Sequence, residues 1–400
     1  MQTKSRMPDT TRSRASSVRP SLDRLGALVT LCVVLALWLA PFVSVRANRI
    51  VAGQPLTAIE ALPVSAAAAL WAVVLIVAAV ALLVRSPWVR LITSVGGLLS
   101  LSVTVGFAAS VLTPAGDSFA RVSPASGFWF LTLGMALLAA DSVTRLNFTP
   151  GLRLAALTLA ALALWLVIAS GTWDDLSLMK EYASRSDSFG GAVRQHLILA
   201  LGSLAGAVIT GVPLGILCHR LPALRALTLP ALNVIQTIPS IALFGILMVP
   251  LGFLAATVPL AYAMGVRGIG TAPAVIALFL YSLLPIVANT AVGLAQVSPS
   301  VVDAARGMGM SRWQRLFAIE IPLALPVVLA GIRIVLVQNL GLAAVAALIG
   351  GGGLGTFIFQ GIGQTAIDLV LLGALPIVLM AFVAAIVLDA MVDLAGGARA

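Results

Sequence analysis

Charged residues are scarce in this sequence: Asp, Glu, Lys and Arg make up 10% of its 400 residues, whereas 60% are hydrophobic. Soluble domains carry roughly 25% charged residues, so this composition excludes an ordinary soluble protein and indicates an integral membrane protein. The net charge of +10 does not indicate nucleic-acid binding, because the basic residues lie in short loops and an N-terminal arm rather than in one patch. We expect these basic residues to interact with anionic lipid.

Cysteine and histidine are also rare, with two residues of each. Cys32 and Cys218 lie in or beside apolar runs, and we interpret them as buried small residues rather than a disulfide framework. His196 and His219 lack Asp, Glu or Cys partners at ligand spacing, so no metal site is predicted. The glycine run at 350–355 has no following Lys and cannot be a G-x-x-x-x-G-K-[ST] phosphate loop.

Long apolar runs dominate the chain. Most of these runs are about 20 residues long, which suits a helix that spans a membrane. The first run is longer than the apolar core of a signal peptide, so we expect an uncleaved anchor. The sequence predicts an all-α polytopic membrane protein with ten spans, near 25–45, 64–84, 91–113, 127–140, 153–171, 196–217, 231–252, 273–294, 326–348 and 369–391.

The polar stretches between these runs divide the chain into five regions. The first region, at the N-terminus, is basic, with Pro and Ser between the charges, and is expected to be a disordered cytoplasmic arm. In the third region, 172–194, Leu176, Met179 and Tyr182 recur at helical spacing. This spacing predicts a surface helix that is either an interfacial linker or a contact for an extracytoplasmic partner. The regions are the arm 1–24, an accessory membrane region 25–171, an extracytoplasmic linker 172–194, a second membrane region 195–392 and a cytoplasmic tail 393–400.

The distribution of Lys and Arg predicts the orientation of the spans. With the N-terminus inside, 16 of the 24 basic residues lie on the inner side, seven lie on the outer side and Arg333 lies within a span. Short cytoplasmic loops are enriched in positive charge. Both termini and the segment 297–326 are therefore expected in the cytoplasm.

Residues 297–326 form the one long polar segment in the second half of the chain. Ser298 and Pro299 suit the start of a helix that runs to about Met308. Gly309 suits the left-handed geometry of a helix end. Ser311, with Gln314 three residues later, has the form of a capping box that starts a second helix.

The second helix of this segment is expected to be amphipathic. We expect one side to anchor the helix, the basic side to face solvent, and two prolines to close the element before the next apolar run. The anchoring residues are Trp313, Leu316 and Phe317. The solvent-facing residues are Arg306, Arg312 and Arg315. The closing residues are Pro322 and Pro326.

This spacing resembles the cytoplasmic loop of ABC importer permeases, which has Glu-Ala-Ala, three residues, Gly, nine residues and Ile-x-Leu-Pro. Asp replaces Glu and Ile replaces Leu in this chain. The resemblance implies a loop that couples the spans to a separate ATPase. The alternative is an amphipathic interfacial hairpin that lies on the membrane. The residues implied in coupling are Asp303, Ala304, Ala305, Gly309, Arg312, Trp313, Ile319 and Pro322, with Ile321 at the Leu position.

From about 195 to 388 the chain resembles the osmoprotectant branch of these permeases, which serves glycine betaine, carnitine and choline. The matching stretches are HLILALGSLAGAVITGVPLGI at 196–216, NVIQTIPSIALFGIL at 233–247, PAVIALFLYSLLPIVANTAVGL at 273–294 and AALIGGGGLGTFIFQGI at 346–362.

The resemblance implies a type I ABC importer permease-like core in a bacterial inner membrane. It also implies a chain that is not itself an enzyme and binds no cofactor, because ATP and Mg²⁺ belong to the partner. The implied partners are ABC ATPase subunits, a second permease copy or paralogue, and an extracytoplasmic substrate-binding protein.

Polar residues within the spans are costly to place in lipid and therefore informative. They gather around helix-breaking prolines, which are tolerated at membrane depth only where the chain faces protein or a water-filled cavity. Alternatively, these polar residues form hydrogen bonds between helices within the bundle. The residues predicted to line a translocation pathway are Gln236, Thr237, Pro239, Ser240, Tyr281, Asn289, Gln338 and Asn339.

Tryptophan is absent from the second group of spans, although it is the best face for a quaternary ammonium. Tyr281, Phe279 and Phe244 could contribute aromatic faces, but the spans indicate a passage rather than a tight binding site. An ion-driven transporter would need paired ionisable residues at mid-membrane, and a scaffold would not need proline-broken spans. A permease for another small solute, such as methionine, is the main alternative.

Overall fold

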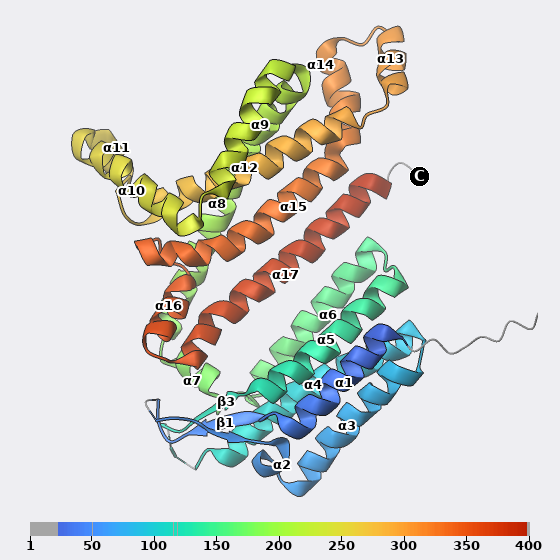
Figure 1. The fold of residues 1–400 in the computed structure, drawn as a ribbon, viewed down its shortest axis with the longest axis vertical. Coiled ribbons are helices and arrows are strands. Elements are labelled where there is room, and N and C mark those ends of the chain that lie inside the picture. Colours follow the sequence, from blue (N-terminus) through green and yellow to red (C-terminus); the bar gives the residue numbers. More distant parts are fainter. Residues whose placement is uncertain (1–22, 50, 115, 118, 398–400) are drawn as a thin grey trace, which may run out of the picture.

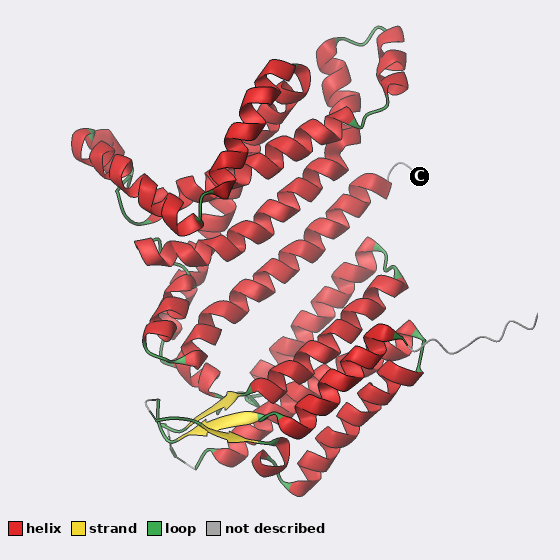
Figure 2. Cartoon of the chain, viewed as in Figure 1, coloured by secondary structure: helices red, strands yellow, loops and turns green. Residues whose placement is uncertain are grey.

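The computed structural model describes residues 23–49, 51–114, 116, 117 and 119–397, and they form a predominantly helical molecule (Figures 1 and 2). Within these residues, nine helices are long and apolar enough to cross a membrane, and α1 is a shorter apolar helix. The all-α polytopic prediction is confirmed. The disordered arm predicted for 1–24 lies outside the described residues, apart from its last two positions.

The N-terminal spans form a bundle around one apolar core. Val33, Val74 and Met135 come from three of its helices and are almost fully buried. Arg90 is also buried, and its guanidinium donates to the carbonyls of Ala81 and Val84 at the end of α3, 2.9 and 2.6 Å away. The helices of this bundle are α1 (Arg24–Leu39), α3 (Val64–Leu83), α4 (Pro87–Leu112) and α5 (Ser126–Leu146). A fifth helix, α6 (Pro150–Ala169), follows at its edge.

A small sheet covers one end of this bundle and was not predicted. Its antiparallel strands lie in the order β2-β1-β3, with Val43 opposite both Leu56 and Pro124. The first span therefore ends at Leu39, because the residues expected to complete it pair in the sheet. The strands are β1 (Val43–Arg46), β2 (Gln54–Leu56) and β3 (Arg121–Pro124), with the short helix α2 (Ala58–Ala61) after β2.

The second membrane region is built on a tight pair of helices, α8 (Ser186–Arg220) and α12 (Thr271–Ala295). A Cβ atom at Gly215 would lie 2.6 Å from the Cβ of Thr290 and 2.8 Å from the carbonyl oxygen of Val287. Glycine is therefore required for this close approach. Around the pair lie α9 (Pro222–Thr237), α10 (Ser240–Thr257), α11 (Pro259–Ala263), α15 (Ile321–Val345), α16 (Gly355–Gly363) and α17 (Ile367–Gly397), with a 3₁₀ turn at Ala346–Ile349.

One predicted span is wrong. The span expected at 231–252 is broken, because α9 ends at Thr237 and α10 begins at Ser240, on either side of Ile238 and Pro239. Helix α17 extends to Gly397, into the tail expected at 393–400.

The two membrane regions meet along α17, which packs beside α6 and α7 (Ser177–Ala183) (Figure 1). At one end of α17 the hydroxyl of Ser123 donates to Asp368, 2.9 Å away, and both residues are buried. Near the other end Arg153 forms an ion pair with Asp393 at 2.7 Å. The accessory region is thus attached to the core at both ends of one helix.

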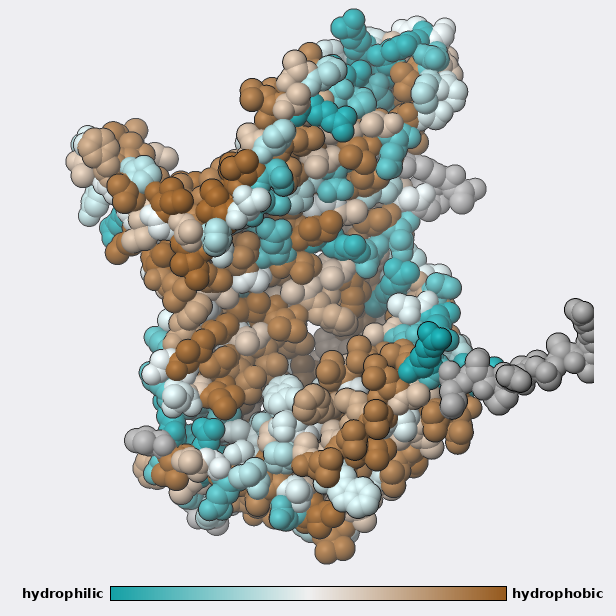
Figure 3. Space-filling view, in the orientation of Figure 1, coloured by the Kyte–Doolittle hydropathy of each residue, from teal (hydrophilic) through white to brown (hydrophobic). Residues whose placement is uncertain are grey.

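Polar residues gather at two opposite ends of the molecule, separated by a largely hydrophobic band (Figure 3). One end carries the sheet and α7, which come from segments predicted to lie outside the cell. The other end carries α13 and α14 of the 297–326 segment and the C-terminal end of α17 (Figure 1). This arrangement fits a protein that crosses a membrane many times.

Candidate functional site

The predicted polar segment folds as two short helices that project from the end of the bundle (Figure 1). The first, α13 (Pro299–Gly307), ends as expected at Gly309, whose φ is +80°. The amide of Met310 donates to Ala305 O at 3.1 Å and that of Gly309 to Arg306 O at 2.9 Å. These two bonds form a Schellman cap.

The predicted capping box is also present. The Ser311 hydroxyl accepts from the Gln314 amide at 3.3 Å, and the Ser311 amide donates to the Gln314 side chain at 2.8 Å. This box starts α14 (Arg312–Arg315). Cap and box together fix the direction of both helices.

The prolines do not close the element, contrary to prediction. Instead α14 continues through a π-helical turn, Leu316–Glu320, into α15. Pro322 follows directly and has no amide to bond to the carbonyl four residues earlier, against which its ring would also press. The wider turn relieves this conflict, and the amide of Ile321 bonds to Leu316 O. Helix therefore extends without interruption from the loop into the span.

The predicted anchor is correct at one residue of three. Leu316 is buried beside Leu294 and Ala324. Trp313 and Phe317 are 70% and 62% exposed and stack on each other, with 5.9 Å between ring centroids. Because both aromatic rings are exposed, they can contact another molecule.

The expected solvent-facing position of Arg315 is wrong. Arg315 is buried, and its Nε lies 3.4 Å from Oε1 of Glu320, which is also buried. Arg220, at the end of α8, donates to Oε2 of the same carboxylate at 2.5 Å. Glu320 is not among the predicted site residues, although a carboxylate inside an apolar run just before Pro322 is a signal that such a group is paired.

Most of the remaining coupling-loop residues lie on the surface. Asp303 forms an exposed ion pair with Arg306 at 3.0 Å, so its carboxylate does not cap the backbone of the loop. The side chain of Ala305 is buried, and Ile319 is half-buried. Besides Asp303 and Trp313, the exposed residues of the predicted set are Ala304, Gly309, Arg312 and Pro322.

The break between α9 and α10 is held by a reciprocal pair of hydrogen bonds. The side-chain amide of Gln236 donates to Tyr281 O at 2.8 Å. That carbonyl lacks its helical donor, because Pro285 stands four residues later. The Tyr281 hydroxyl donates in turn to Ile238 O in the break. We call this arrangement the Gln236–Tyr281 clasp.

The other predicted pathway residues fall into two groups. Asn339 is fully buried and lies 3.0 Å from Ser203 Oγ of α8 and 2.9 Å from Ser282 Oγ of α12, so its contacts are those of a helix-packing residue. Asn289 bonds to Pro285 O of its own helix at 2.7 Å. The remaining residues are exposed (Thr237, Pro239) or half-buried (Gln236, Ser240, Asn289, Gln338).

The aromatic residues considered for a cation are mostly hidden. Phe244 is 1% exposed and Tyr281 is 4% exposed, and both belong to the apolar core between α10 and α12. In this conformation their rings are unavailable to a passing solute. Arg333, expected alone within a span, pairs with Asp389 of α17.

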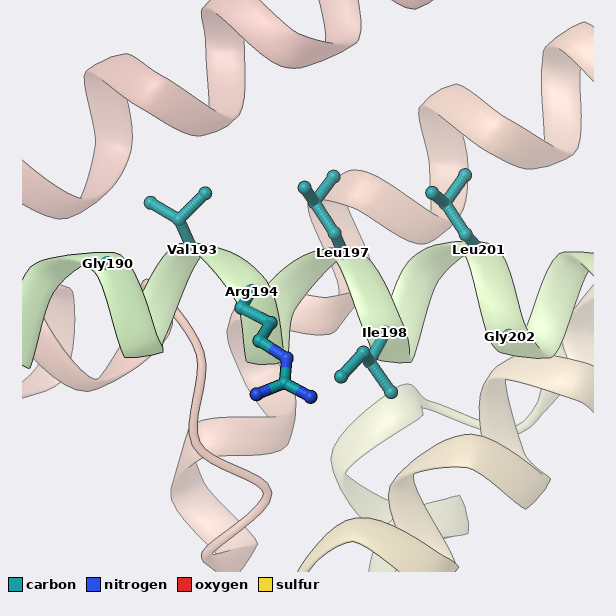
Figure 4. A pocket seen from close by; sticks show the side chains of 7 residues that line it. All are labelled: Gly190, Val193, Arg194, Leu197, Ile198, Leu201 and Gly202. Atoms are coloured by element: carbon teal, nitrogen blue, oxygen red, sulfur yellow. The ribbon is translucent and has the colours of Figure 1, made fainter.

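A shallow groove on the surface lies along the outer part of α8 (Figure 4). Val193, Leu197 and Leu201 point to one side, and Arg194 and Ile198 point away from them. All of its lining residues come from this one helix, and none belongs to the predicted pathway. Its apolar surface suits lipid rather than a polar solute.

Comparison with known families accounts for both membrane regions. Residues 211–396 match the family described as binding-protein-dependent transport system inner membrane component. Osmoprotectant import permease protein OsmW of Salmonella typhimurium is 48% identical over 189 residues, covering 47% of this chain and 83% of the relative. The chain belongs to the ABC importer permeases. The resemblance inferred from the loop and spans is thereby confirmed.

Other permeases of this family are also similar. Carnitine transport permease protein OpuCB of Listeria monocytogenes is 39% identical over 47% of this chain and 79% of its own length. The glycine betaine/carnitine/choline transport system permease protein OpuCB of Bacillus subtilis is 34% identical over 47% and 80%. Residues 23–179 match the N-terminal domain of ABC transporter permease YehY. This permease therefore carries a second, separately recognised domain ahead of its core.

Among solved structures, an inward-facing MetNI methionine ABC transporter aligns with 52% of this permease and 95% of the solved chain. The TM-score is 0.43 and the sequence identity is 20%. At this level the likeness bears on neither substrate nor mechanism.

The Gly309 cap can be tested by one change made at two positions. Gly309→Ala is expected to strain the loop by about 1–3 kcal/mol, because alanine disfavours a positive φ. A Cβ at either Gly309 or Gly307 meets open space, so only the backbone geometry differs. Gly307→Ala, within α13, should be harmless. ATPase co-purification and solute uptake should fall for Gly309→Ala alone, and equal behaviour of the two variants would contradict a loop fixed by this cap.

The pathway prediction can be tested by thiol labelling in a variant that lacks Cys32 and Cys218. Cysteines at Thr237 and Ser240 should react with a water-soluble maleimide, and the rates should change when ATP is bound. Asn339→Cys is the buried control and should stay inert. If Thr237→Cys and Ser240→Cys are as inert as the control in both states, the helix break faces lipid or protein rather than a passage.

Proposed function

We propose that this permease moves a small quaternary-ammonium osmolyte, such as glycine betaine or choline, into the cell in an ATP-driven importer. The observation that carries the proposal is the projecting 297–326 loop, with its Schellman cap, capping box and exposed Trp313–Phe317 stack. A soluble ATPase needs such a rigid element, because a flexible loop would absorb the movement it is meant to transmit. The choice of solute is supported by the relatives, which are named as osmoprotectant, carnitine and glycine betaine/carnitine/choline permeases.

ATP and Mg²⁺ would be bound by the partner ATPase. The permease sequence has no G-x-x-x-x-G-K-[ST] stretch, so a phosphate cradle of that kind must come from another subunit. We also infer a second permease copy or paralogue and an extracytoplasmic substrate-binding protein. The buried state of Tyr281 and Phe244 supports this division of labour, because the spans present few aromatic faces to a cation.

The proposed orientation places the loop and both termini in the cytoplasm. Arg85 follows α3, Arg145 lies in the last turn of α5 and Arg220 ends α8, so all three lie at helix ends that are predicted to be cytoplasmic. Positive charge of this kind marks cytoplasmic segments. The sheet and α7 would then face the outside, where a binding protein approaches.

Reconstitution tests the proposal. The permease, its ATPase and its binding protein in liposomes should accumulate glycine betaine or choline when ATP is supplied, and methionine should not compete. The permease alone should neither bind nor hydrolyse ATP. Uptake that follows an ion gradient without the ATPase, or uptake restricted to methionine, would contradict the proposal.

A further inference from the structure

The two coupling helices have few attachments to the spans. Within α13 only Ala305 is buried, and α14 joins the bundle through Leu316 and through its continuation into α15. Among the described residues, the Arg220–Glu320 pair is the ion pair that joins this element to a different span. Movement of the loop can therefore reach the spans through its chain connections to α12 and α15, through Leu316 or through this pair.

Glu320 is a buried carboxylate that is held by specific partners. Its carboxylate is buried, and it accepts from two guanidinium groups, those of Arg220 and Arg315. A buried carboxylate is costly unless it is paired, so its local structure depends on both partners. The exposed Asp303–Arg306 pair in the same loop carries no such constraint.

The π-helical turn is what brings Arg315 and Glu320 together. Residues five apart lie about 140° apart around a regular α-helix and cannot pair across it. In a π-turn, bonds run from residue i to residue i+5, so the same two positions stack one above the other. Pro322 thus causes the π-turn, and the π-turn allows the Arg315–Glu320 ion pair to form.

Arg220 is the last residue of α8, the helix that packs most closely on α12. A force on Glu320 therefore reaches α8 at its end and, through the Gly215 contact, reaches α12. The Gln236–Tyr281 clasp joins α12 to the end of α9. The charges at the foot of the loop and the broken helix are connected through one rigid pair of helices.

We propose that Glu320 is a positioning residue for coupling, which clamps the ATPase-contacting loop to α8 through Arg220 and keeps its direction through Arg315. This inference rests on the proposed function. Loss of the clamp leaves the ATPase bound and active but makes its work unproductive, since the loop then moves without moving α8.

The test measures uptake and ATP hydrolysis in the same liposomes, with the complete complex. Glu320→Gln and Arg220→Ala should each lower the solute moved per ATP about tenfold while the ATPase stays bound. In Arg220→Ala the carboxylate of Glu320 keeps Arg315 as a partner, so this variant should remain folded even if Glu320→Gln inserts poorly. Arg225→Ala removes an exposed arginine of the neighbouring helix α9 and should keep the wild-type ratio.

A conservative replacement separates coupling from packing. Arg220→Lys keeps a cation opposite Glu320, which also retains Arg315, and should preserve most of the ratio lost in Arg220→Ala. A wild-type ratio in Arg220→Ala and Glu320→Gln, or a ratio in Arg220→Lys as low as in Arg220→Ala, would overturn the inference. Failure of the wild-type complex to couple uptake to ATP would instead overturn the proposed function.

Discussion

The structure depends on one constraint: inside a membrane, every backbone group that loses its helical partner must find another. Prolines create the need. Pro285 frees the carbonyl of Tyr281, which receives the Gln236 amide, and the break at Pro239 exposes Ile238 O to the Tyr281 hydroxyl. Pro322 is accommodated by the π-turn. The polar residues of the spans stand where this constraint requires them.

The same constraint makes some parts of the core rigid and leaves others weakly held. The broken helix is held to α12 by two side-chain hydrogen bonds, which can exchange partners more easily than a continuous backbone ladder can. The loop, by contrast, continues into α15 without a gap and is clamped to α8 by Glu320. In the proposed importer, the rigid loop transmits movement of the ATPase to the spans, and the weakly held break between α9 and α10 is where the spans rearrange.

Local chemistry made the loop largely predictable from the sequence. Gly309, Ser311 and Gln314 act through backbone bonds to near neighbours, so their spacing alone indicates their roles. The errors at Trp313, Phe317 and Arg315 arise because side-chain type alone does not show which partner is available. The two exposed rings stack on each other, and the buried Arg315 pairs with Glu320.

Long-range pairing was less accessible. Strands β1 and β3 are separated by more than 70 residues and contain too few residues for an alternating pattern to be recognised. Asn339 was read as a pathway residue because a polar group in a span has two explanations, and its serine partners lie on other helices. The choice between a passage and a helix contact requires the neighbours in space.

The central claim is that the 297–326 loop is the surface on which the ATPase acts, and site-specific photocrosslinking tests it most directly. A benzophenone side chain in place of exposed Trp313 should crosslink to the ATPase in intact membranes, whereas one in place of exposed Ile59, at the opposite end of the molecule, should not. Capture of the ATPase from position 59, or capture of lipid or the extracytoplasmic binding protein alone from position 313, would contradict the account.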